Sequence, residues 1–194
     1  MNVPLSNDNI FNALKINKSY IIKYSDLSEY DNLSDAFGSK PFINILIESQ
    51  TNSGHWVCMY RPSPNHYVYF NSYGKKYDDD TDFISRLKNK ILGNDVNTIR
   101  NLFDVDDKVD YNHIKYQGTK SQVCGRYVIN FVRSMKNGLS LKDYQIFLKS
   151  SKKGTYDDTI LKLTEDVSWV VIMIESLFFL LLWCKRGYEL SLDR

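Results

Sequence analysis

The chain has 194 residues, the length of one folded domain, and 43% of them are hydrophobic and 25% charged. This composition excludes a disordered or repetitive chain, and a formal net charge of +2 is too small to indicate a nucleic-acid or membrane partner by itself. We therefore expect one compact domain, and we predict a monomer.

The cysteine content predicts the compartment. The chain has Cys58, Cys124 and Cys184, and it lacks a charged-then-apolar signal segment at its N-terminus. An odd, sparse count without such a segment predicts free thiols in a reducing environment. We expect no cofactor and no zinc site at Cys58, His55 and His66, because no paired Cys-x-x-Cys or His-x-x-x-His spacing is present.

Charge is unevenly distributed along the chain. Eight basic residues and one acid, Asp143, lie between Lys120 and Lys153, which gives this stretch a net charge of +7, whereas residues 78–82 and 104–110 are rich in Asp. The simpler interpretation of the basic stretch is a solvated helix face. The alternative is a surface for an anionic partner such as DNA.

The first forty residues are polar, and we predict loops around short helices near residues 9–14 and 25–37. Residues 42–47 then form an apolar, largely β-branched run that predicts a buried strand. Turn residues follow, and two further strands are predicted at 55–61 and 67–70, so that the chain forms a hairpin.

Alternation along the second strand of this hairpin separates its side chains. His55, Val57 and Met59 are expected on one face, whereas Trp56 and Cys58 lie on the other. Cys58 is therefore interpreted as a small core residue.

The second half of the chain is predicted to be mainly helical. An Asp at the start and a Gly after the end delimit a helix at 82–92, and a further strand is predicted at residues 111–116. Apolar residues recur at helical spacing after Cys124, which places this cysteine at the first turn of a buried helix that ends before Asn137 and Gly138. A capping pattern predicts one more helix at 140–148.

The C-terminal segment reaches the lower length limit of a membrane span. From Val167 to Cys184, 15 of 18 residues are apolar. Glu175 near its centre costs roughly 2–3 kcal/mol on insertion scales, and the basic residues follow the segment instead of preceding it. We divide the chain into a main domain at 1–165 and an apolar C-terminal helix at 166–194, either buried or a membrane tail anchor.

Three short strings carry chemistry that fits a thiol hydrolase. They are Gly54-His55-Trp56, the string Tyr-Phe-Asn-Ser-Tyr-Gly containing Asn71, and the string from Gln117 to Gly125 containing Cys124. A helix N-terminus and a facing imidazole lower the pKa of a thiol, so Cys124 is the candidate nucleophile and His55 the candidate base.

Two amides complete this candidate site. Because the start of one hairpin strand neighbours the end of the next, Asn71 can hold the His55 ring in one tautomer. Gln117 is the candidate side-chain donor to an oxyanion, and Gln122 competes with it. His66 and His113 are interpreted as surface residues.

The chain resembles the adenovirus endopeptidase and its relatives among viral processing proteases and, more distantly, the SUMO-specific proteases. The resemblance lies in the order His, amide, Gln, Cys-Gly and in three strings: Gly-His-Trp, Phe-Asn-Ser-Tyr-Gly and Gln-Gly-x-x-Ser-x-x-Cys-Gly. The resemblance covers about residues 42–137. Asn71 departs from the carboxylate of most relatives, while Gln117, seven residues before the cysteine, matches the spacing of the adenoviral branch.

This resemblance implies an α+β fold, papain-like in site geometry but permuted, with a mixed central sheet packed on the helix that bears Cys124. It also implies a cysteine endopeptidase that cleaves capsid or core precursor proteins after Gly-type residues in the virion or infected host cell. Trp56 would line the substrate groove, and DNA or a short peptide would be an activator. Alternatives are an isopeptidase for ubiquitin-like modifiers and a catalytically inactive scaffold.

Overall fold

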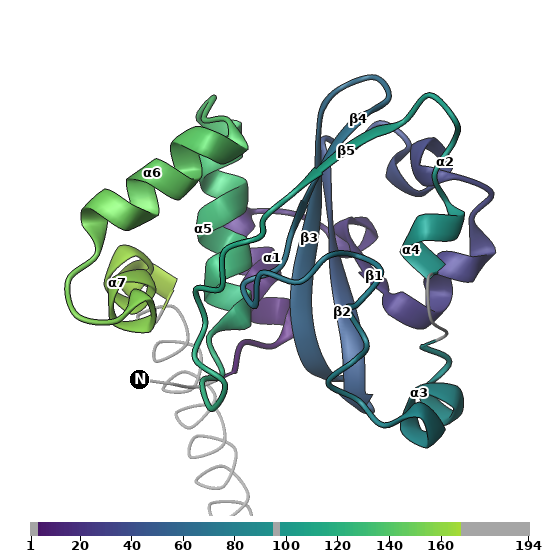
Figure 1. The fold of residues 1–194 in the computed structure, drawn as a ribbon, viewed down its shortest axis with the longest axis horizontal. Coiled ribbons are helices and arrows are strands. Elements are labelled where there is room, and N and C mark those ends of the chain that lie inside the picture. The colour runs from purple at the N-terminus through teal and green to yellow at the C-terminus, as the bar shows by residue number, and fades with distance from the viewer. Residues whose placement is uncertain (1–3, 95–97, 168–194) are drawn as a thin grey trace, which may run out of the picture.

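A computed structural model describes residues 4–94 and 98–167 of the chain, and its centre is a five-stranded mixed sheet (Figure 1). The strands lie in chain order, with the two outer pairs parallel and the inner pairs antiparallel. Their bounds are β1 Ile21–Lys23, β2 Phe42–Gln50, β3 Ser53–Ser63, β4 His66–Phe70 and β5 Lys108–Tyr111.

The predicted hairpin is confirmed and forms the middle of the sheet. The strands β2 and β3 pair from Phe42 opposite Tyr60 to Gln50 opposite Ser53. Asn52 at one turn and Asn65 at the other take left-handed backbone angles, with φ of 57° and 55°. Asn is among the few non-glycine residues that tolerate this conformation, so the sequence can turn tightly at both places.

The helices begin where side chains cap them. Ser6, Ser140 and Thr155 each accept a hydrogen bond from a backbone N–H three residues later and form a capping box. The helices are α1 Asn7–Leu14, α2 Leu33–Phe37, α3 Arg86–Leu92, α4 Thr98–Asn101, α5 Cys124–Lys136, α6 Leu141–Ser151 and α7 Tyr156–Leu163, with 3₁₀ turns η1 Lys18–Tyr20 and η2 Tyr24–Glu29.

Helices cover both faces of the sheet and form two hydrophobic cores (Figure 1). On one face α5 packs against β3, with α1, α6 and α7 around it. Phe70 of β4 stacks on Phe131 of α5 with ring centroids 4.5 Å apart. On the other face α2, α4 and η2 cover Val57 and Met59. The α+β prediction, with a mixed sheet packed on the helix that bears Cys124, is confirmed.

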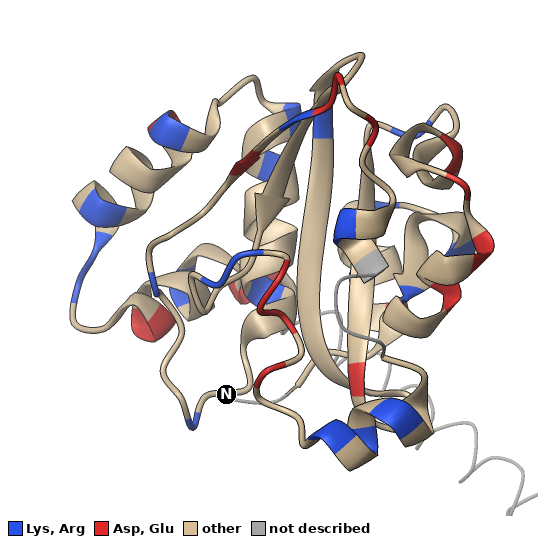
Figure 2. Ribbon diagram, turned by 45° about the vertical axis from the view of Figure 1, so that its right-hand side comes forward, with Lys and Arg blue, Asp and Glu red and all other residues tan. Residues whose placement is uncertain are grey.

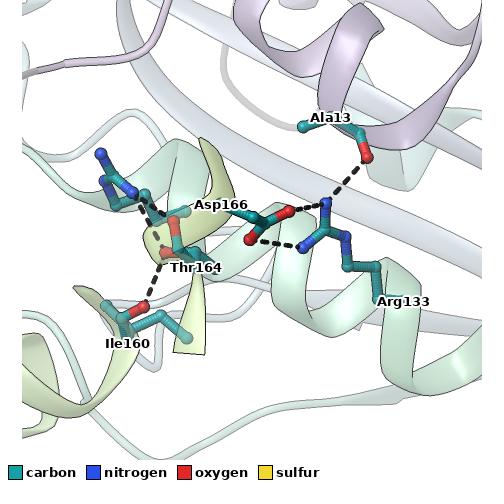
Figure 3. A network of polar contacts seen from close by, with 6 residues as sticks. Ala13, Arg133, Ile160, Thr164 and Asp166 are labelled. Atoms are coloured by element: carbon teal, nitrogen blue, oxygen red, sulfur yellow. Dashed lines mark hydrogen bonds and ion pairs between the residues drawn. The ribbon is translucent and has the colours of Figure 1, made fainter. Parts of the chain in front are cut away.

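The end of the described chain is tied to α5 by polar contacts (Figure 3). Arg133 forms two hydrogen bonds with the carboxylate of Asp166, at 2.7 and 3.1 Å, and one with the carbonyl oxygen of Ala13 at 3.0 Å. The guanidinium of Arg126 donates to the carbonyl oxygen of Thr164 at 2.8 Å. Val167 is 2% exposed, so the packed chain continues at least to this residue.

Several element predictions were wrong in detail. The helix predicted at 25–37 is two short pieces, η2 and α2, because Asn32 caps a new helix inside the range. The strand predicted at 111–116 lies earlier, at Lys108–Tyr111, where it pairs in parallel with β4. The helix predicted from residue 82 begins at Arg86, after the cap Ser85. The strand β1 and the helices α4 and α7 were not predicted.

The predicted C-terminal helix beyond residue 167 lies outside the described residues, so the division of the chain at 165 stays a prediction. Within 4–94 and 98–167, no helix has the length and apolarity needed to cross a membrane.

Candidate active site

The candidate base and its candidate partner are in contact. His55 lies near the start of β3 and Asn71 follows the end of β4, and the Nε2 atom of His55 is 2.9 Å from the Oδ1 atom of Asn71. Both side chains are buried. The antiparallel hairpin therefore produces the meeting of strand start and strand end that the sequence predicts.

Two further hydrogen bonds fix the orientation of the Asn71 amide. Its Oδ1 atom accepts from the backbone N–H of Tyr73 at 2.9 Å, and its Nδ2 atom donates to the Oδ1 atom of Asp80 at 2.9 Å. The group that faces His55 is therefore an acceptor, and Nε2 of the imidazole must carry the proton. In the neutral ring Nδ1 is therefore the unprotonated nitrogen, which can accept a proton from a thiol.

Burial keeps this imidazole neutral. Loss of solvent lowers the pKa of His55 from its ordinary value of 6.5 to about 4, against the opposite effect of the Asn71 hydrogen bond. At neutral pH His55 is therefore in the form that accepts a proton.

Aromatic rings enclose the imidazole. Tyr73 stacks on His55 with centroids 4.5 Å apart, and Phe83 approaches its edge at 5.7 Å. Sequence reasoning assigned no role to Tyr73, Phe83 or Asp80. Tyr73 stands inside the string that contains Asn71, which was the one available signal; Asp80 and Phe83 lie in an acidic turn segment that gives none.

Cys124 is the first residue of α5, as predicted, and it is 6% exposed. Burial raises the pKa of the Cys124 thiol, while hydrogen bonds with the backbone of Trp56, Gly125 and Cys124 itself lower it by less. The contact with Trp56 places the sulfur against the residue that follows His55. Burial raises the pKa of Tyr73, and the charge of a Cys124 thiolate would raise it further.

The buried Gln117 side chain is anchored beside these groups. Its Oε1 atom accepts from the hydroxyl of Ser72 at 2.6 Å, and its Nε2 atom donates to the carbonyl oxygen of Ser121 at 2.8 Å and to the hydroxyl of Tyr73 at 3.4 Å. Gln122, the alternative oxyanion donor, is exposed. A preorganised donor needs a fixed side chain, and the buried Gln117 meets this requirement.

Trp56 borders a small cavity next to the thiol. The cavity of about 200 Å³ is lined by residues 4–7 and 52–54 together with Leu46, Trp56 and Cys124. The indole N–H of Trp56 donates to the carbonyl oxygen of Leu5 at 3.2 Å, which fixes the ring in the cavity wall. Two larger hollows, of about 490 and 440 Å³, contain none of the candidate site residues in their linings.

The other histidines lie away from this site. His113 is exposed, as predicted, whereas His66 is partly buried and its Nε2 atom is 2.8 Å from the carboxylate of Asp110. In the parts of the chain that the structure describes, no group of three or more His, Cys, Asp and Glu side chains is arranged to hold a metal ion.

Part of the basic stretch serves contacts within the chain. Figure 2 shows basic and acidic residues interspersed over the ribbon. Arg126 is 2% exposed, and Arg133 is paired with Asp166, so two of the eight basic side chains serve internal contacts. The lysines of the stretch remain exposed.

The fold and the site thus define an α+β protein with a buried His–Asn pair on its sheet and a cysteine at a helix N-terminus, which lines a cavity together with Trp56, the residue after His55. The chain is 28% identical over 169 residues to "Uncharacterized protein V9" of Sputnik virophage, and the match covers 84% of this chain and 94% of that protein. No family model matches the chain.

Two solved structures are similar to the chain at a low level. The ASFV pS273R protease has 17% sequence identity and a TM-score of 0.45, and the match covers 82% of this chain and 66% of that one, slightly less than two thirds of its length. The central domain of the uncharacterized Lpg1148 protein from Legionella pneumophila has 15% identity and a TM-score of 0.43, covering 87% and 98% of the two chains.

Proposed function

We propose that this protein is a viral cysteine endopeptidase in which Cys124 is the nucleophile, His55 the base, Asn71 the residue that orients the base and Gln117 an oxyanion donor. The observation that carries the proposal is the buried His55–Asn71 hydrogen bond of 2.9 Å, beside a residue, Trp56, that lines one cavity together with the cysteine at the N-terminus of α5. Similarity to a virophage protein supports the viral origin.

The chemistry follows from the proton positions. Nδ1 of His55 takes the thiol proton while Nε2–H stays bonded to Asn71, and the thiolate attacks the carbonyl carbon of the scissile peptide. The oxyanion of the tetrahedral intermediate is stabilised by the backbone N–H at the start of α5 and by one N–H of Gln117, which exchanges its long 3.4 Å contact with the Tyr73 hydroxyl for the oxyanion. The imidazolium then gives its proton to the leaving amine, and water hydrolyses the thioester with the same residue as base.

The proposed substrate is a protein with a small residue immediately before the peptide bond that is cleaved. Cleavage after Gly-type residues in capsid or core precursors is what the family resemblance implies, and Trp56 lines the cavity beside Cys124 where such a residue would bind. A peptide library with preference for bulky residues before the cut would exclude this assignment.

The test uses the full chain and a Gly-Gly-containing precursor. Wild-type protein should cleave it, Cys124→Ala and His55→Ala should lose almost all activity, and Asn71→Ala should lose part of it because orientation is what Asn71 supplies. Cys58→Ala is the matched control, since Cys58 is a fully buried thiol on the same face of β3 as Trp56. Equal cleavage by wild type and Cys124→Ala would refute the proposal.

The same assay separates the rival functions. Cleavage of ubiquitin-like conjugates but not of the precursor would identify an isopeptidase. A chain that cleaves neither substrate, and in which a thiol probe labels Cys124 no faster than Cys58, would be an inactive scaffold.

An anionic activator is a separate proposal that rests on the exposed lysines between Lys120 and Lys153. Added DNA should raise the cleavage rate at low salt, and the effect should fade as salt increases. A rate that DNA leaves unchanged at low salt would dismiss the activator.

A further inference from the structure

Asp80 is a buried carboxyl group aimed at the candidate site. It is 1% exposed, and its Oδ1 atom accepts a hydrogen bond from Nδ2 of Asn71 at 2.9 Å. The carboxyl also interacts with the hydroxyl of Tyr69 on β4. Asp80 therefore lies behind Asn71, on the side of the amide away from His55.

We propose that Asp80 is a positioning residue, which holds the Asn71 amide with its oxygen toward His55 and thereby keeps the imidazole in its Nε2–H tautomer. The consequence for catalysis rests on the proposed function, whereas the effect on the tautomer does not. No proton moves to or from Asp80 in this role.

The two ends of an amide group have nearly the same shape but opposite hydrogen-bonding character. Rotation of the Asn71 side chain by half a turn exchanges Oδ1 and Nδ2 at almost no steric cost, and it would present an N–H donor to His55. Nε2 of the ring would then have to accept, the proton would move to Nδ1, and the ring could no longer take a proton from the thiol. An acceptor at Asp80 favours the productive orientation, and the N–H of Tyr73 favours it from the other side.

Fold stability does not explain Asp80. Burial raises its pKa from the ordinary value of 3.8 to about 7, and the exposed Asp79 adds to this rise, while the nearby Tyr69 hydroxyl, the hydrogen bond from Asn71 and the charge of Lys75 oppose it. A carboxyl whose pKa rises on folding makes the folded state less favourable at neutral pH. Perturbed groups of this kind occur preferentially at functional sites.

The test combines spectroscopy with kinetics on the full chain. In ¹⁵N-labelled wild-type protein at pH 7, the His55 signals, identified by their absence in His55→Gln, should show the Nε2–H tautomer. In Asp80→Ala this signature should become a mixture of tautomers, and kcat should fall on the order of 10–100-fold with KM unchanged, because Asp80 does not line the substrate cavity. Asp80→Asn retains an acceptor oxygen and should recover the wild-type signature.

Two controls keep the result interpretable. Asp79→Asn removes the neighbouring exposed carboxylate and should change neither readout, and Asp80→Val, which leaves no void, replaces Asp80→Ala if that variant does not fold. In an Asn71→Ala background, Asp80→Ala should reduce kcat by less than about 2-fold, because its route to His55 is already gone.

The outcomes distinguish this inference from the proposed function. An unchanged tautomer and unchanged kcat in Asp80→Ala and Asp80→Val would overturn the role of Asp80 and leave the peptidase intact. A wild-type chain that cleaves nothing, but whose His55 tautomer depends on Asp80, would remove the peptidase and support the positioning role.

Discussion

Substituting Asp80 or His55 should expose two opposite pH dependences of folding stability that nearly cancel in the wild-type protein. The pKa of Asp80 rises on folding from 3.8 to about 7, so the folded state binds its proton more tightly. The pKa of His55 falls from 6.5 to about 4, so the folded state resists protonation. Both shifts arise mainly from burial, and both groups contact Asn71.

The magnitudes follow from about 1.4 kcal/mol for each pH unit between the folded and unfolded pKa. For Asp80 the contribution to stability is fully present below pH 3.8 and is lost as pH rises to about 7, a change of about 4 kcal/mol. For His55 the contribution is fully present above pH 6.5 and is lost as pH falls to about 4, a change of about 3 kcal/mol. Between pH 7 and pH 4 the two changes oppose each other.

Urea unfolding of wild type, Asp80→Asn and His55→Gln at each pH from 4 to 8 measures this directly. Relative to wild type, Asp80→Asn should lose about 4 kcal/mol as pH falls from 8 to 4, and His55→Gln should gain about 3 kcal/mol over the same range. Differences from wild type that stay flat across this range in both variants would show that neither group is titrating from a buried position, and would refute the reasoning.

Three further changes test the fold around the site. Gly54→Ala should lower the free energy of unfolding, measured in urea, by roughly 3 kcal/mol or more. A Cβ there would overlap the carbonyl oxygen of Ile47 and lie 2.8 Å from Cα of Glu48. A soluble variant of wild-type stability would contradict this packing. Phe131→Ala should cost about 3–5 kcal/mol by the same measurement, and a loss below 1 kcal/mol would mean that the stack on Phe70 is not formed. Ser140→Ala removes the capping box of α6 and should cost about 1 kcal/mol, whereas Ser140→Thr should be nearly neutral.

The sequence predicts the hairpin and the cysteine helix because local pattern decides them. The alternation around Val57 and Met59 assigns the two faces of β3 correctly, and the two cores contain those faces as expected. Cys124 falls at the first residue of its helix because the apolar spacing begins there. The three-residue strand β1 was missed because so short a segment shows no periodicity and exists through its pairing with β2.

The site, too, combines contacts that local sequence pattern predicts with contacts that depend on long-range packing. The contact between His55 and Asn71 follows from hairpin geometry, and the strand positions predicted from the sequence are enough to anticipate it. The contacts of Asp80 and of Tyr73 depend on how an irregular segment returns to β4, and no residue pattern between 71 and 84 specifies that path. Long-range contacts through loops are therefore the part of the site that needs coordinates.

The pKa values of the two buried reactive groups bear on how the proposed peptidase would begin its reaction. Burial raises the pKa of Cys124 and lowers that of His55, so both shifts favour the neutral thiol and imidazole over the thiolate–imidazolium pair. Hydrogen bonds with the backbone of Trp56 and of the start of α5 oppose the first shift, and Asn71 opposes the second, yet burial is the larger effect at each group. Proton transfer is therefore coupled to attack on the bound substrate, and the thiol should react with small alkylating probes much more slowly than a preformed ion pair would. Fast labelling of Cys124 at pH 6, where an isolated thiol is almost entirely protonated, would show that the ion pair already exists and would contradict this argument.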